Sequence, residues 1–76
     1  MEANFTTKDL NLAAYLYASG QDLAGVERQG TVCWFLFAQR VHCEELATAY
    51  WNGKAECGVR LFVDAQRVIK DIIFSA

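Results

Sequence analysis

The stretch DLAGVERQGTVCWFLF (residues 22–37) decides the fold. Two β-prone runs, residues 22–28 and 31–37, flank the dipeptide Gln29-Gly30. A two-residue connection that contains glycine is a strong short-range signal of a β-hairpin, because hairpin turns need positive φ. The sequence therefore predicts an antiparallel hairpin across this stretch.

The predicted turn also fixes which residues pair across the hairpin. With Gln29-Gly30 at the turn, Val26 lies opposite Cys33 and Gly25 opposite Trp34. An antiparallel strand with one solvated face alternates apolar and polar residues, whereas the second strand here is apolar on both faces. Its faces are Cys33, Phe35 and Phe37 on one side and Val32, Trp34 and Leu36 on the other. Which face packs on the helices stays open.

Helical periodicity predicts a first helix directly before the hairpin. Thr6 is expected to cap its N-terminus with Asp9 at the third helical position, and Phe5 and Leu10 to form a hydrophobic staple. Gly20 is expected to end the helix in a left-handed conformation. The apolar arc covers more than half of the helical wheel, so we expect this helix to be central and to contact two neighbours.

Two more helices are predicted after the hairpin, over Gln39–Trp51 and Val59–Phe74, with Asn52-Gly53 ending the first of them. The last helix has one apolar stripe, formed by Leu61, Phe62, Ala65, Val68, Ile69, Ile72 and Ile73. Its opposite side predicts two intrahelical ion pairs, Arg60–Asp64 and Arg67–Asp71. The sequence thus predicts a single α+β domain over residues 1–76, in the order α-β-β-α-α, with an antiparallel hairpin packed on three helices.

Composition narrows the class of protein. The chain has 76 residues, 54% of them hydrophobic, so enough apolar surface exists to exclude disorder as the default. A domain of this size has marginal stability and often needs a partner chain, a metal or disulfides. The net charge of −2 is a poor match for nucleic acid, whose binding depends on basic residues that neutralise phosphates.

The longest unbroken apolar run, Val32 to Ala38, is far shorter than the roughly 20 residues of a membrane-spanning helix. Residues 1–7 lack the basic start and apolar run of a signal peptide. Three cysteines cannot all pair within one chain, so we expect reduced thiols and a cytoplasmic location.

No motif points to catalysis or to a cofactor. His42 and Cys43 are neighbours, and adjacent helical residues point about 100° apart, which separates a nucleophile from its base. Cys33, Cys43, Cys57 and His42 lack the close C-x₂-C spacing of structural zinc sites. We therefore expect no enzyme, no metal, no cofactor and no small-molecule ligand, while a redox or metal role for the three thiols stays open.

The two tryptophans are the candidate interaction residues. If the Phe35 face packs on the helices, Trp34 points away from them, and an exposed apolar patch of this kind marks a partner site. The alternative is that the second or third helix covers Trp34. Trp51 either roofs the core or contributes to an interface. The candidate interface is Val32, Trp34, Leu36 and Trp51.

Three elements carry a resemblance to a known family: TKDLNLAA (residues 7–14), GVER (residues 25–28) with FLF (residues 35–37), and YWNG (residues 50–53). They resemble short bacterial and phage-associated proteins that are catalogued as a domain of unknown function, over Phe5 to Ile73. The resemblance implies an α-β-β-α-α domain of prokaryotic or viral source, and no catalytic residue. Ala38-Gln39 and Cys57-Gly58 stand where that family carries acidic residues and an Asp-Pro, so the caps of the last two helices stay open, and the expected fold is unchanged.

These observations predict a small noncatalytic protein-interaction module that forms a homodimer or binds a protein partner. The Trp34 faces of two copies could stack, or edge strands could join into a four-stranded sheet. An inhibitor or adaptor that acts on a host protein would use the same patch. The alternative is a nucleic-acid-associated accessory or regulatory protein of phage or mobile-element origin.

Overall fold

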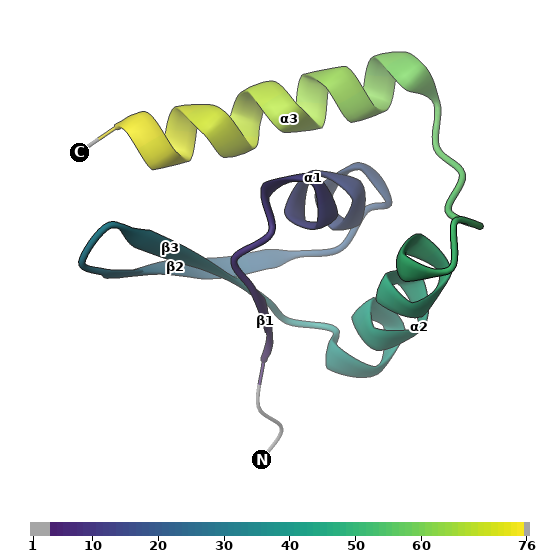
Figure 1. Ribbon diagram of the computed structural model, residues 1–76, viewed down its shortest axis with the longest axis horizontal. Coiled ribbons are helices and arrows are strands. Elements are labelled where there is room, and N and C mark those ends of the chain that lie inside the picture. The colour runs from purple at the N-terminus through teal and green to yellow at the C-terminus, as the bar shows by residue number, and fades with distance from the viewer. Residues whose placement is uncertain (1–3, 76) are drawn as a thin grey trace.

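A computed structural model describes residues 4–75. In order, the elements are β1 (Phe5–Thr7), α1 (Leu10–Ala18), β2 (Leu23–Gln29), β3 (Val32–Phe37), α2 (Arg40–Trp51) and α3 (Val59–Phe74). The predicted α+β class is confirmed, and the order α-β-β-α-α holds with one strand added in front (Figure 1).

The added strand β1 pairs antiparallel with β3, with Phe5 opposite Phe37 and Thr7 opposite Phe35. The sheet order is therefore β1-β3-β2, with β3 at the centre. The sequence interpretation placed these residues at the start of α1, because threonine is common both at helix N-caps and in strands. Pairing with a strand about 30 residues away decides between the two, and that pairing leaves no local signal.

The start of α1 also differs from the prediction. Asp9, not Thr6, is the N-cap, and its Oδ1 accepts hydrogen bonds from the backbone N–H groups of Asn11 at 2.9 Å and Leu12 at 3.1 Å. Phe5 lies in β1 and does not directly precede the N-cap, so it is not at the position from which a hydrophobic staple forms. Aspartate caps a helix as well as serine or threonine does, and it sits here directly before the apolar periodicity.

The hairpin forms with a different register from the predicted one. Val26 lies opposite Phe35 rather than Cys33, and the turn residues are Gly30 and Thr31. Gly30 has φ 63° at the first central position of the turn, where both common hairpin turns need positive φ. The predicted turn would have put Gln29 there. The observed register differs from the predicted one by two residues, because Val26 pairs with Phe35 rather than with Cys33. An even shift leaves each side chain of β3 on the face that strand alternation predicts.

Figure 1 shows α1 between the sheet and α3, with α2 beyond one end of the sheet. The Phe35 side of β3 is therefore the side that packs on α1, and both Phe35 and Phe37 are buried there. The buried core is Leu12, Ala13, Ala14, Tyr15, Leu16, Phe35, Phe37, Cys43, Ala47, Ala65 and Ile69. The predicted central position of the first helix is confirmed, since α1 packs against both α2 and α3.

The predicted glycine stops are confirmed. Gly20 has φ 90° and Gly53 has φ 72°. After α1, the Gln21 N–H donates to the Leu16 carbonyl at 3.1 Å, which is the 6→1 hydrogen bond of a Schellman motif. Gln39 and Gly58 provide no side-chain cap for α2 and α3.

Helix α3 has the predicted bounds but buries a narrower stripe than expected. Ala65 and Ile69 are buried, whereas Leu61 is 60% exposed and Val68 is 37% exposed. The reason is position: α3 is an outer helix that packs mainly on α1, so residues beside the contact line stay open. On its outer side the predicted Arg60–Asp64 pair forms at 3.3 Å, and Arg67–Asp71 is not among the ion pairs of residues 4–75.

Candidate protein-interaction surface

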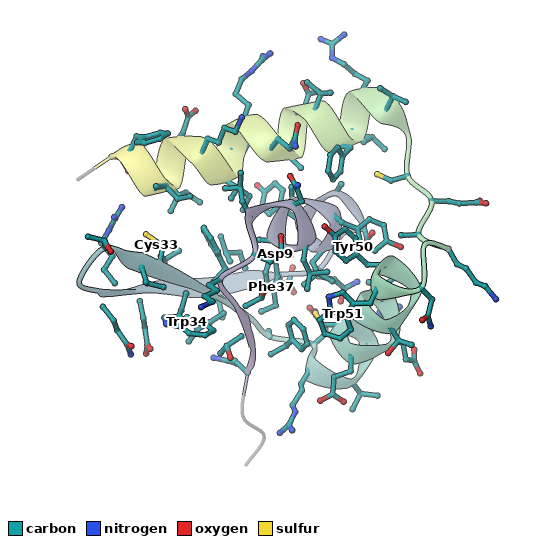
Figure 2. All side chains as sticks on the ribbon, in the orientation of Figure 1. Asp9, Cys33, Trp34, Phe37, Tyr50 and Trp51 are labelled. Atoms are coloured by element: carbon teal, nitrogen blue, oxygen red, sulfur yellow. The ribbon has the colours of Figure 1, made fainter. Side chains whose placement is uncertain are left out.

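The candidate surface is the side of the sheet opposite α1 and α3, which we call the outer sheet face. Its apolar centre is Val32, Trp34 and Leu36 of β3, and all three side chains are half-buried. Figure 2 shows Trp34 pointing away from α1 and α3 while Cys33, the preceding residue, points toward them. This arrangement follows from the two-residue period of a strand.

Trp34 lies between two opposite charges on this face. Glu27 of β2 is its direct partner in the sheet register, so both side chains lie on the outer side. On the β1 side, the Nζ of Lys8 lies 5.9 Å from the centre of the Trp34 ring, within the range of a cation–π contact. Lys8 and Glu27 are themselves exposed. The Lys8 side chain thus screens the indole on a face of the sheet that α1 and α3 do not cover.

The remaining neighbours on the outer sheet face are small or polar. Leu36 lies between Thr6 on β1 and Gly25 on β2. No heavy atom lies within 4 Å of a Cβ placed on Gly25, so that side of Leu36 is open. The sheet edge β2 carries an irregularity between Leu23 and Gly25. The outer sheet face therefore has an apolar row along β3 with polar or open positions on both flanks.

Trp51 does not roof the core. It is 66% exposed, and Tyr50 beside it makes the inward contact, with its ring stacked 6.1 Å from that of Tyr15. Trp51 belongs to α2 rather than to the sheet, so the structure does not place it on the same element as Trp34. Among the aromatic side chains of residues 4–75, the contact pair is Tyr15 with Tyr50.

Sequence reasoning missed several exposed apolar residues on α3. Val59 and Phe74 are 79% and 80% exposed, and Val63 is 40% exposed. None of the three belongs to the stripe that the helical wheel predicts as buried. Their position outside the stripe could have predicted their exposure, because an apolar residue outside the stripe of an amphipathic helix does not face the core.

Sequence reasoning also missed a pocket between α1, the end of α2 and the start of α3. Its volume is about 390 Å³, and its lining is Tyr15, Tyr50, Gly53, Ala55, Cys57, Val59 and Phe62. Burial, followed by the nearby Asp9 carboxylate, raises the pKa of Tyr50 above its ordinary value. The pocket is within the size range of small-molecule sites. The pocket brings together residues of three elements, so no local sequence pattern predicts it.

The three thiols are free and lie in different surroundings. Cys43 is buried, and burial raises the pKa of its thiol. Cys33 accepts a hydrogen bond from Arg28 Nη1 at 3.3 Å, and Cys57 donates to the Gly58 carbonyl at 3.5 Å. Within residues 4–75, no three His, Cys, Asp or Glu side chains are grouped to hold a metal ion.

Arg28 is a further residue that the sequence did not single out. Its Nη2 donates to the carbonyls of Ile72 at 2.7 Å, Ile73 at 2.9 Å and Ser75 at 3.3 Å. The last carbonyls of a helix have no partner within it, and a cation there is also favoured by the helix dipole. Arg28 therefore fastens the end of α3 to the hairpin.

The described helices include none that is both long and apolar enough to span a bilayer. Neither the curated proteins nor the solved structures provide a match to this chain. One family model does match, over residues 2–75, and its description is Domain of unknown function (DUF5659). The chain therefore belongs to the DUF5659 family.

Proposed function

We propose that this chain is a small noncatalytic protein-interaction module that self-associates through the outer sheet face. The observation that carries the proposal is the row Val32, Trp34 and Leu36 on the side of β3 opposite α1 and α3. Full burial of one large apolar side chain is worth about 1.5–3 kcal/mol relative to its exposure. All three are half-buried in one protomer, so a partner would complete their burial.

Packing of the outer sheet faces is favoured over joining of sheet edges. β1 occupies one side of β3, so an edge-joined dimer would be a six-stranded sheet rather than the four-stranded one expected from a hairpin. Of the two edge strands, β1 is only 3 residues long, and β2 has an irregularity after Leu23 and carries Glu27 and Arg28. Bulges and charges of this kind protect an edge strand from pairing.

The nucleic-acid alternative is not carried forward, because the net charge is −2 and three of the seven basic side chains are engaged with other groups of the chain. Arg40 pairs with Glu44 at 3.0 Å and Arg60 pairs with Asp64 at 3.3 Å. Arg28 binds the end of α3. Proteins that follow a phosphate backbone use basic side chains arranged in a continuous stripe, and these three are paired with other groups of the chain.

The resemblance to short prokaryotic proteins supports a further part of the proposal, a bacterial or phage source. A cytoplasmic location accompanies it, since Cys33, Cys43 and Cys57 are free and a reducing compartment keeps thiols in that state.

The experiment is light scattering of the full chain over a dilution series from millimolar to nanomolar concentration. The proposal predicts a mass of twice 8.5 kDa at high concentration that falls to 8.5 kDa on dilution. A constant mass of 8.5 kDa at every concentration would exclude self-association.

A further inference from the structure

We infer that two copies pack their outer sheet faces about a two-fold axis parallel to β3, so that Lys8 of each copy faces Glu27 of the other. This inference rests on the proposed function and specifies the partner and its orientation. The starting observation is the charge order across the sheet: Lys8 on the β1 side, Trp34 in the middle and Glu27 on the β2 side.

A two-fold axis that brings two sheet faces together can lie in only two simple directions relative to the strands. If the axis runs parallel to β3, the rotation exchanges the β1 side with the β2 side. Lys8 of one copy then meets Glu27 of the second copy on both flanks of the paired Trp34 side chains. The contact is isologous, as a two-fold interface must be, and it contains two opposite-charge contacts.

If the axis instead runs across the strands, each flank meets the same flank of the copy. Lys8 would then face Lys8, and Glu27 would face Glu27. Like charges across an interface cost affinity, and complementary charges fix the orientation of the partners. The charge row therefore selects the axis parallel to β3. Both axes keep the two sets of strands nearly aligned, as in sheet-on-sheet packing, where strand directions differ by about 30°, so the charge row alone decides between them.

Each charged residue lies at the rim of the apolar row and remains exposed in one protomer. Rim charges contribute modestly to affinity, but they set which arrangement is formed. The ammonium group of Lys8 lies over the Trp34 ring in one protomer, and its flexible stem allows it to leave the ring and reach a carboxylate across the interface.

The test is a charge-reversal cycle at low ionic strength, with the dimer dissociation constant as the readout. Lys8→Glu and Glu27→Lys should each raise the dissociation constant about tenfold, because each creates two like-charge contacts per dimer. The double variant should return it to within about twofold of the wild type. Lys70→Glu on α3 and Glu45→Lys on α2 are matched controls, since both residues are exposed and lie outside the sheet.

Failure of the inference is distinguishable from failure of the proposed function. The axis is wrong if the effects of the two single reversals add in the double variant. It is also wrong if neither reversal changes the dissociation constant. In both cases the interaction surface stands, provided that Trp34→Glu disrupts the dimer. If the wild-type chain is monomeric throughout, both are wrong. Circular dichroism of each variant confirms that the fold is retained.

Discussion

The ammonium nitrogen of Lys8 lies 5.9 Å from the centre of the Trp34 ring, on the side of the sheet that α1 and α3 do not cover. This contact joins the segment between β1 and α1 to the central strand. It also explains how a large aromatic residue is tolerated on a sheet face without a helix over it. A side chain that can move aside covers Trp34 in one protomer and leaves it accessible to a second.

Removal of the lysine side chain should uncover Trp34. In a Trp51→Phe background, which leaves one tryptophan, Lys8→Ala should increase quenching of the remaining fluorescence by acrylamide. The loss of stability should be small, about 0.5–1 kcal/mol, as for an exposed cation–π contact. The quenching is measured at a concentration below that of dimer formation. Equal quenching of the two proteins would show that Lys8 does not cover the ring.

The N-cap of α1 provides a direct comparison of the sequence prediction with the structure. Asp9→Ala removes the acceptor of two backbone hydrogen bonds and should lower the free energy of unfolding by about 1 kcal/mol. Thr6→Ala, at the exposed position that the sequence predicted as the cap, should have a clearly smaller effect. Urea denaturation measures both. The reverse order of the two effects would favour a helix that begins at Thr6.

Arg28 should control the end of α3. Arg28→Ala leaves the carbonyls of Ile72, Ile73 and Ser75 without this donor, and we expect a loss of about 1–2 kcal/mol. Amide hydrogen exchange should accelerate in the last turn of α3 more than elsewhere. Arg67→Ala, an exposed arginine on the outer side of the same helix, is the control. Uniform acceleration along the chain would argue against a local role.

The buried Cys43 thiol should make stability fall in alkali. Burial raises its pKa in the folded chain above the ordinary value of 9.0, so the unfolded chain releases this proton first. The contribution of this thiol to stability is therefore fully present below its ordinary pKa and is lost as the pH rises through the higher pKa of the folded chain. Cys43→Ala should lower stability at neutral pH and remove this part of the pH dependence. The same alkaline loss in Cys43→Ala would assign it to other groups, with Tyr50→Phe as the next variant.

The features that the sequence predicted are those with local causes. The bounds of α2 and α3 follow from apolar periodicity. Gly20 and Gly53 end α1 and α2 because they can adopt positive φ. The inner and outer faces of β3 follow from strand alternation, which survives the two-residue difference in register between the predicted and observed partners of Val26.

The features that it did not predict depend on contacts between distant residues. β1 exists because Phe5 pairs with Phe37, and the contact of Lys8 with Trp34 depends on β1 in turn. The candidate residues Val32, Trp34 and Leu36 could be named from alternation alone. Their charged flanks could not, because the predicted register placed Gly25, not Glu27, opposite Trp34.

The most direct test of self-association through the outer sheet face compares Trp34→Glu with Phe74→Glu by sedimentation equilibrium. Phe74 is the control because it is an exposed aromatic residue on α3, on the other side of the sheet. Trp34→Glu should sediment as a folded 8.5 kDa monomer at concentrations where the wild type and Phe74→Glu are dimers. A Trp34→Glu chain with the same dissociation constant as the wild type would contradict the account.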